Sequence, residues 1–146
     1  MTMTASAHAV TTRSDHRPRV LIVDDDTVIR MLLQDICQEN GWTVVGAATA
    51  ADAILAAGLH ELNLVLLDFH LGDADALSLL GQLRIVSPTT PIVVLTGEQP
   101  EGLSGAIKQA GGDGVVGKPC SVAQVAALLD RYRPAPAGSR SDYRIA

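Results

Sequence analysis

Hydrophobic residues follow two alternating patterns between about residue 20 and residue 133. Short, mostly aliphatic runs occur at Val20–Val23, Thr43–Ala47, Leu64–Leu67, Ile92–Leu95 and Val115–Val116. After these runs, apolar residues recur at intervals of three or four, as in Val28, Leu32 and Ile36, which is the spacing of an amphipathic helix. The pattern therefore predicts five strands that alternate with five helices.

Residue types at the predicted helix ends support these assignments. Asp26 precedes the first helix, Asp75 or Asp73 the third and Ser121 the last, and each side chain can accept a hydrogen bond from a free backbone N–H. Gly41 stands where the first helix is expected to end.

Three of the predicted strands are uninterrupted aliphatic runs, as expected when helices cover both faces of a parallel sheet. Alternation of strand and helix is typical of an α/β fold with a doubly wound sheet. We therefore predict one sheet of five parallel strands, flanked by five helices. In such sheets, ligands bind beyond the carboxyl ends of the strands.

Composition limits the domain and its functions. Of the 146 residues, 47% are hydrophobic but only 3% are aromatic, so aliphatic side chains must fill the core. We expect one domain over residues 19–133, with a disordered leader (1–18) and a flexible tail (134–146). The net charge is −5, and because the two terminal stretches together carry +2, the middle carries −7. An acidic middle argues against binding to DNA and favours a cation site or a basic partner.

Cysteine usage and hydropathy bear on the compartment. Cys37 and Cys120 do not form a CxxC motif, so we expect neither a disulfide nor a metal site from them, which fits a reducing compartment. No apolar run approaches the roughly 18 residues of a membrane span, and a secretory signal is not evident. These features favour a cytoplasmic protein with no membrane association.

Polar residues follow the predicted strands at the points where the ligand of such a fold binds. They are Asp24, Asp25 and Asp26 after the first strand, Asp68 after the third, Thr96 after the fourth and Lys118 after the fifth. Crowded carboxylates repel one another, and a hard cation such as Mg²⁺ relieves that repulsion. With a hydroxyl and an ammonium group beside them, the set suits phosphoryl transfer onto a carboxylate.

Four segments in this order resemble the receiver domain of two-component response regulators, a flavodoxin-like fold of the CheY type. They are VLIVDDD (Val20–Asp26), LVLLD (Leu64–Asp68), IVVLTG (Ile92–Gly97) and GKP (Gly117–Pro119). The spacings agree as well, with 43 residues from Asp25 to Asp68, 28 to Thr96 and 22 more to Lys118. The resemblance covers roughly residues 18–133.

The resemblance implies roles for individual residues. Asp24 and Asp25 match the acidic pair that organises Mg²⁺, and the backbone carbonyl of His70 matches a further metal ligand. Asp68 matches the phosphoacceptor, which also binds the metal.

The phosphoryl group has its own expected contacts. Thr96 matches the hydroxyl residue that follows the phosphoryl group in the active state, and Lys118 matches the lysine that binds it. Gly97 matches a small residue that leaves the site open, and Pro119 matches a proline that commonly follows a cis peptide bond.

Several positions depart from the family pattern. Gly72 stands where proline is common and Ala76 where glycine is usual, so the loop after Asp68 is expected to differ in shape. Val115 replaces an aromatic residue whose rotamer often carries the signal. His70 and Glu98 occupy positions that tune phosphate lifetime in the family.

The predicted function is that of a single-domain response regulator, not an enzyme acting on other molecules. A sensor histidine kinase or histidine phosphotransfer protein would donate the phosphoryl group to Asp68. Phosphorylation would then alter the face made by the fourth helix, fifth strand and fifth helix, which would bind an unidentified output protein or a second copy. The 13 residues after Arg133 are too few for a DNA-binding domain.

Two alternatives remain at this point. A pseudo-receiver would only dock to a partner, without phosphorylation, and the departures at Gly72, Ala76 and Val115 motivate that hypothesis. A flavodoxin-like cofactor binder would need a phosphate-binding loop after the first strand, where this chain has three aspartates.

Overall fold

A computed structural model describes residues 17–135, apart from residues 73, 98–99 and 119. The described residues form seven strands: β1 (Arg19–Val23), β2 (Thr43–Ala47), β3 (Leu64–Asp68), β4 (His70–Leu71), β5 (Ala74–Asp75), β6 (Ile92–Thr96) and β7 (Gly114–Gly117). Five helices lie in the same part of the chain: α2 (Thr27–Glu39), α3 (Ala50–Leu59), α4 (Ala76–Val86), α5 (Pro100–Gln109) and α6 (Val122–Tyr132). Each predicted strand and helix is confirmed within a few residues of its expected position.

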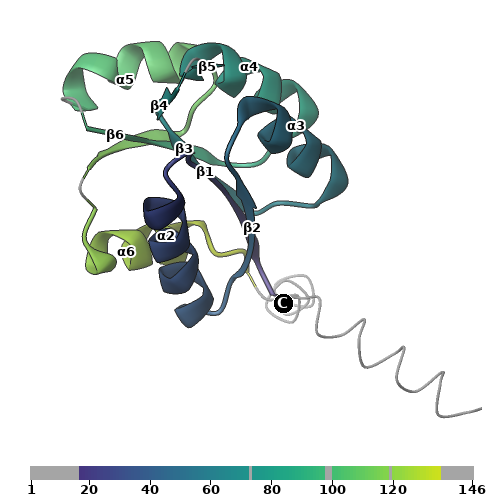
Figure 1. Cartoon of the computed structure of the whole chain (residues 1–146), viewed down its shortest axis with the longest axis vertical. Helices are drawn as coiled ribbons and strands as arrows, with labels where there is room; N and C mark the ends of the chain where they lie inside the picture. The colour runs from purple at the N-terminus through teal and green to yellow at the C-terminus, as the bar shows by residue number, and fades with distance from the viewer. Residues whose placement is uncertain (1–16, 73, 98–99, 119, 136–146) are drawn as a thin grey trace, which may run out of the picture.

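The main sheet has five parallel strands in the order β2-β1-β3-β6-β7. Figure 1 shows α2 and α6 on one face of the sheet and α3, α4 and α5 on the other. The predicted doubly wound α/β fold is therefore confirmed, and the carboxyl ends of all five strands lie along one edge.

Aliphatic side chains form a separate core on each face of the sheet. Along β1, Leu21 and Val23 face the core beneath α3, α4 and α5, whereas Val20 and Ile22 face the core beneath α2 and α6. The same alternation occurs in β3 and β6, since successive side chains of a strand point to opposite faces. This arrangement explains why these strands are uninterrupted aliphatic runs.

Helix starts follow the prediction, but the extent of the apolar stripes does not. Asp26, Asp75 and Ser121 each accept hydrogen bonds from backbone N–H groups in the first turn of their helices. By contrast, Val28, Leu32 and Val122 are more than half exposed, although each fits the helical spacing. These three side chains lie beyond the stripe that each helix buries against the sheet.

The loop after Asp68 contains an element that the pattern did not predict. The two-residue strands β4 and β5 pair antiparallel, with His70 opposite Asp75 and Leu71 opposite Ala74. Between them, Gly72 has a φ of +58°, a value that the proline ring cannot adopt. The loop therefore has a shape that proline at this position would exclude.

Other expectations have mixed outcomes. Both cysteine thiols are free, and Cys37 is buried within the core beneath α2 and α6. No helix in the described part of the chain is long and apolar enough to cross a bilayer. Most of the expected leader (1–18) and tail (134–146) lies outside the described residues, as do Asp73, Glu98 and Pro119.

Candidate functional site

The ends of three central strands place the predicted site residues next to one another. Asp24 directly follows Val23, which pairs with Leu67, so Asp24 and Asp68 lie on adjacent strands. Across the other side of β3, Asp68 pairs with Leu95 of β6. Parallel pairing in register thus brings Asp24 and Asp68 to the same edge of the sheet, although they are more than forty positions apart in the chain.

Three carboxylates form the acidic part of the site. One oxygen each from Asp24, Asp25 and Asp68 lies within 4.8 Å of the others. Asp24 and Asp68 are buried, with 1% and 5% of their surfaces exposed, whereas Asp25 faces solvent. An all-oxygen donor set that is open on one side suits a hard cation such as Mg²⁺, which binds through few protein ligands and keeps several waters.

Lys118 is the cation of the site. Its Nζ lies 3.0 Å from Oδ1 of Asp68 and 3.4 Å from Oδ2 of Asp24. Burial lowers the pKa of Lys118, but the hydrogen bond and charge of Asp68, followed by those of Asp24, raise it more. The pKa of Lys118 therefore lies above its ordinary value, and the side chain is a protonated ammonium group at neutral pH.

Both carboxylate oxygens of Asp24 accept hydrogen bonds, one from the backbone of Asp26 and one from Lys118. Burial raises the pKa of Asp24, and repulsion from Asp68 adds to this, while a hydrogen bond from the backbone N–H of Asp26 and the charge of Lys118 oppose the rise. That N–H donates to Oδ1 of Asp24 at 2.9 Å. Asp26 therefore supports Asp24 with its backbone and caps α2 with its side chain, which accepts from Val28 and Ile29.

His70 and Thr96 lie beside these charges. The backbone N–H of His70 donates to Oδ1 of Asp68 at 3.2 Å, which places the His70 backbone next to the predicted phosphoacceptor. Thr96 is fully buried at the end of β6, and its carbonyl accepts from the backbone N–H of Lys118 at 2.6 Å. The structure thus brings together every strand-end residue predicted for the site, and their chemical roles stay predictions.

Two glycines keep side-chain atoms away from the site. Among the described residues, no atom lies within 4 Å of where a Cβ at Gly97 would stand. A Cβ atom at Gly72 would lie 3.5 Å from Oδ2 of Asp25. The loop after Asp68 therefore passes close to the exposed carboxylate.

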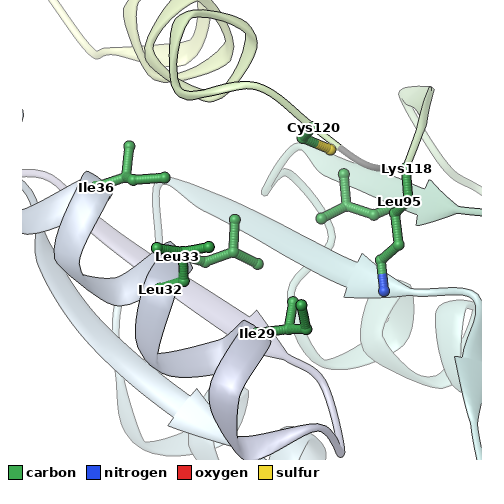
Figure 2. Close-up of a pocket in the computed structure, with 7 residues that line it drawn as sticks. All are labelled: Ile29, Leu32, Leu33, Ile36, Leu95, Lys118 and Cys120. Atoms are coloured by element: carbon green, nitrogen blue, oxygen red, sulfur yellow. The ribbon is translucent and has the colours of Figure 1, made fainter.

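An apolar pocket of about 290 Å³ lies beside Lys118 (Figure 2). Four of its lining residues come from one face of α2, and the others are Leu95, Lys118 and Cys120. Burial raises the pKa of the Cys120 thiol, although the charge of Lys118 opposes the rise, so this thiol is not an activated nucleophile. Lys118 lines the pocket and also contacts both buried carboxylates.

Comparison with known proteins agrees with this geometry, because residues 20–130 match the response regulator receiver domain family. The chain belongs to this family. Receiver domains are signalling modules of two-component systems. The receiver domain described here has a TM-score of 0.74 against a CheY-like receiver domain protein from Methanospirillum hungatei, at 29% identity, covering 79% of this chain and 92% of that one.

Curated relatives of this receiver domain are longer proteins. It is 34% identical over 118 residues to the probable transcriptional regulatory protein TcrX of Mycobacterium tuberculosis, covering 80% of this chain and 50% of TcrX. It is 44% identical over 105 residues to Protein PetR of Rhodobacter capsulatus, covering 70% of this chain and 43% of PetR. The chain therefore spans about half the length of these relatives, and the similarity concerns the receiver portion.

One residue near the receiver site did not emerge from the sequence pattern. Arg30 donates from Nη1 to the backbone carbonyl of Asp24 at 2.6 Å. The sequence does mark this residue, because Arg30 is the one charged residue within the otherwise apolar stretch from Val28 to Leu33. We expected site residues only at positions just after strands, and Arg30 lies within a helix.

Proposed function

We propose that this receiver domain accepts a phosphoryl group on Asp68 in a Mg²⁺-dependent reaction. The observation that carries the proposal is the joint placement of three carboxylates and the Lys118 ammonium at one open edge of the sheet. The donor would be a phosphohistidine on a sensor histidine kinase or histidine phosphotransfer protein.

The chemistry follows from the positions of the side chains. A carboxylate oxygen of Asp68 attacks phosphorus, the P–N bond of the phosphohistidine breaks, and its electron pair returns to the imidazole nitrogen. The product is an acyl phosphate. Lys118, already 3.0 Å from Asp68, would bind a phosphoryl oxygen, and the Thr96 hydroxyl would bind another.

Asp24, Asp25, Asp68 and the carbonyl of His70 are the residues that would hold the metal. Bound Mg²⁺ would neutralise charge on the phosphoryl oxygens. Two of these carboxylates are nearly fully buried, so a divalent cation would also relieve their repulsion.

The donor surface would include the exposed apolar side chains of α2. Val28, Met31 and Leu32 are each more than half exposed, and Leu32 also lines the pocket beside Lys118. A protein that brings a phosphohistidine to Asp68 would contact this surface. Burial of these side chains would stabilise the encounter.

Output would pass through α5, β7 and α6, either to another protein or to a second copy of the domain. Phosphorylation would shift Thr96 and Lys118, whose backbones are joined by a 2.6 Å hydrogen bond. Gly117, the residue before Lys118, lies near α5. A Cβ atom added there would lie 3.2 Å from Cγ of Pro100, in the first turn of α5. The backbone of Gly117 therefore passes close to Pro100, and this proximity would offer a route for the signal that needs no aromatic residue at Val115.

We further propose that residues 19–133 form the folded receiver domain and that it acts in the cytoplasm. Its catalysis would extend only to its own phosphorylation and dephosphorylation.

The test is phosphorylation by acetyl phosphate, resolved on a Phos-tag gel. We expect a Mg²⁺-dependent shifted band in the wild type and in Asp35→Asn, an exposed control on α2, but not in Asp68→Asn. Equal shifts in wild type and Asp68→Asn would contradict the proposal. Absence of a shift in wild type, together with full cellular activity of Asp68→Ala, would support the docking-only alternative.

A further inference from the structure

The guanidinium group of Arg30 contacts the backbone of the acidic pair. Arg30 lies in the first turns of α2, and helical side chains lean toward the helix N-terminus, which directs Arg30 back over the β1–α2 turn. Its Nη1 reaches the carbonyl oxygen of Asp24 at 2.6 Å, a short, charge-assisted hydrogen bond. The contact joins the helix to the peptide group that links Asp24 to Asp25.

That peptide group decides where the second carboxylate points. The N–H of Asp24 donates to the carbonyl of Ala47 at 3.0 Å, and its Oδ1 accepts from the N–H of Asp26 at 2.9 Å. The contact with Arg30 fixes the remaining polar group of the Asp24 backbone. Rotation of the Asp24–Asp25 peptide would swing Asp25, the exposed member of the cluster, away from Asp68.

Strand β2 provides the space that Arg30 occupies. A Cβ atom at Gly46 would lie 3.4 Å from Cδ of Arg30 and would overlap the side-chain amide of Gln34. Arg30 and Gln34 are thus packed over the same glycine, one helical turn apart. Gln34 therefore provides a matched control that shares the packing site.

We propose that Arg30 is a positioning residue for the divalent-cation site, holding the Asp24–Asp25 peptide so that both carboxylates face Asp68. The proposal rests on the proposed function for the identity of the cation, Mg²⁺. Replacing a group that orients a metal ligand typically weakens metal binding by about 10- to 100-fold.

Charge and geometry predict opposite effects when Arg30 is replaced. If Arg30 acted only as a positive charge near the cluster, its removal would make Mg²⁺ bind more tightly, because like charges repel. If it positions the carboxylates, its removal would make Mg²⁺ bind more weakly. The sign of the change therefore separates the two roles.

The experiment is isothermal titration of Mg²⁺ into the full-length wild type, Arg30→Met, Arg30→Lys and Gln34→Ala. We expect the Kd to rise about tenfold in Arg30→Met. Arg30→Lys keeps the charge but loses the planar fork, so its Kd should lie between those of wild type and Arg30→Met. Gln34→Ala should match wild type. Circular dichroism would verify that each variant is folded.

Specific outcomes would overturn the proposal. A folded Arg30→Met with the wild-type Kd or a lower one would overturn it, as would an equal loss of affinity in Gln34→Ala. If Arg30→Met does not fold, Arg30→Lys decides, and a wild-type Kd in that variant would overturn the proposal.

Labelling by acetyl phosphate separates this proposal from the proposed function. Wild type that binds Mg²⁺ but is never phosphorylated would contradict phosphoryl transfer and leave the role of Arg30 intact. Wild type that does not bind Mg²⁺ would overturn both. At saturating Mg²⁺, Arg30→Met should regain most of the wild-type labelling rate, because the phosphoacceptor and Lys118 are unchanged.

Discussion

Nζ of Lys118 lies 3.0 Å from Oδ1 of Asp68, although the two residues are 50 positions apart in the chain. The Lys118 ammonium group is therefore already next to the carboxylate oxygen of Asp68, where it could bind an oxygen of a phosphoryl group attached to that residue. The pair links the end of β7 to the end of β3, with β6 between them.

Replacing Lys118 should slow phosphorylation much more than replacing Lys108, the other lysine of the chain. We expect Lys118→Gln to lower the rate of labelling by acetyl phosphate roughly 100-fold, the loss typical when one preorganised donor to a developing charge is removed. Lys108→Gln, at an exposed position on α5, is the control and should label at the wild-type rate. Equal rates in the two variants would remove Lys118 from the mechanism.

Asp24 should lower the stability of the metal-free protein at neutral pH. Burial raises its native pKa above the ordinary 3.8, so the native state holds the proton more tightly than the unfolded chain does. Below pH 3.8, the carboxyl group is protonated in both states and imposes no cost. As the pH rises through the raised native pKa, the free energy of unfolding of wild type should fall relative to Asp24→Asn.

Urea denaturation at several pH values, followed by fluorescence of the single tryptophan, Trp42, measures this difference. Trp42 is 1% exposed, so unfolding should change its emission. Asp24→Asn should be the more stable protein at neutral pH, and Mg²⁺ should stabilise wild type more than the variant. If the free energies of unfolding of the two proteins differed by the same amount at every pH, ionisation of Asp24 would not destabilise the native state.

Arg84 should matter for stability but not for phosphorylation. Its guanidinium donates to the carbonyls of Ser87, Pro88, Thr90 and Gly111 and to the carboxylate of Asp113. These contacts join α4 to the loops before β6 and β7, at the sheet edge opposite the acidic cluster.

We expect Arg84→Met to lower the free energy of unfolding by roughly 2–3 kcal/mol, because several carbonyls lose their donor at once. Arg131→Met, at an exposed position on α6, should change it by less than about 0.5 kcal/mol. Labelling of folded Arg84→Met by acetyl phosphate should equal that of wild type. A slowed reaction in the folded variant would show that the two edges of the sheet are coupled.

Two glycines make α5 intrinsically weak. Gly102 and Gly105 lie at exposed positions where an added Cβ would meet no described atom within 4 Å, and Ile107 is a buried residue of the helix. Gly102→Ala and Gly105→Ala should each raise the free energy of unfolding by about 0.5–1 kcal/mol, measured in urea.

Gly112→Ala is the opposite control. There, an added Cβ would collide with the side chain of Ile107 and approach Leu80, so the variant should be less stable than wild type. If the alanines at 102 and 105 also destabilise the protein, then α5 is limited by something other than its glycines.

Continuous aliphatic runs were sufficient to identify the three central strands, β1, β3 and β6, because these strands are buried on both faces. Val20–Val23 and Leu64–Leu67 have no exposed face on which polar residues would occur. An unbroken run of aliphatic residues was therefore enough to identify each as a strand. The same reasoning placed Asp24 and Asp68 together, since parallel strands in register end at a common edge.

Features that depend on tertiary contact could not be predicted in this way. The β4–β5 pair is only two residues long on each side, too short for any periodic signal. Val28 and Leu32 have helical spacing but face solvent, since the width of the buried stripe depends on how α2 lies against the sheet and α6. Arg30 acts through a backbone carbonyl, which has no counterpart in the pattern of side chains.

The central claim is that Asp68 itself receives the phosphoryl group, and trapping by borohydride tests it most directly. Hydride reduces an acyl phosphate to an alcohol, so a phosphorylated aspartate becomes homoserine, and peptide mass spectrometry locates that residue. After treatment with acetyl phosphate and Mg²⁺, we predict homoserine at position 68 in wild type. Homoserine at Asp24 or Asp25 instead, or its absence from every aspartate, would contradict the claim.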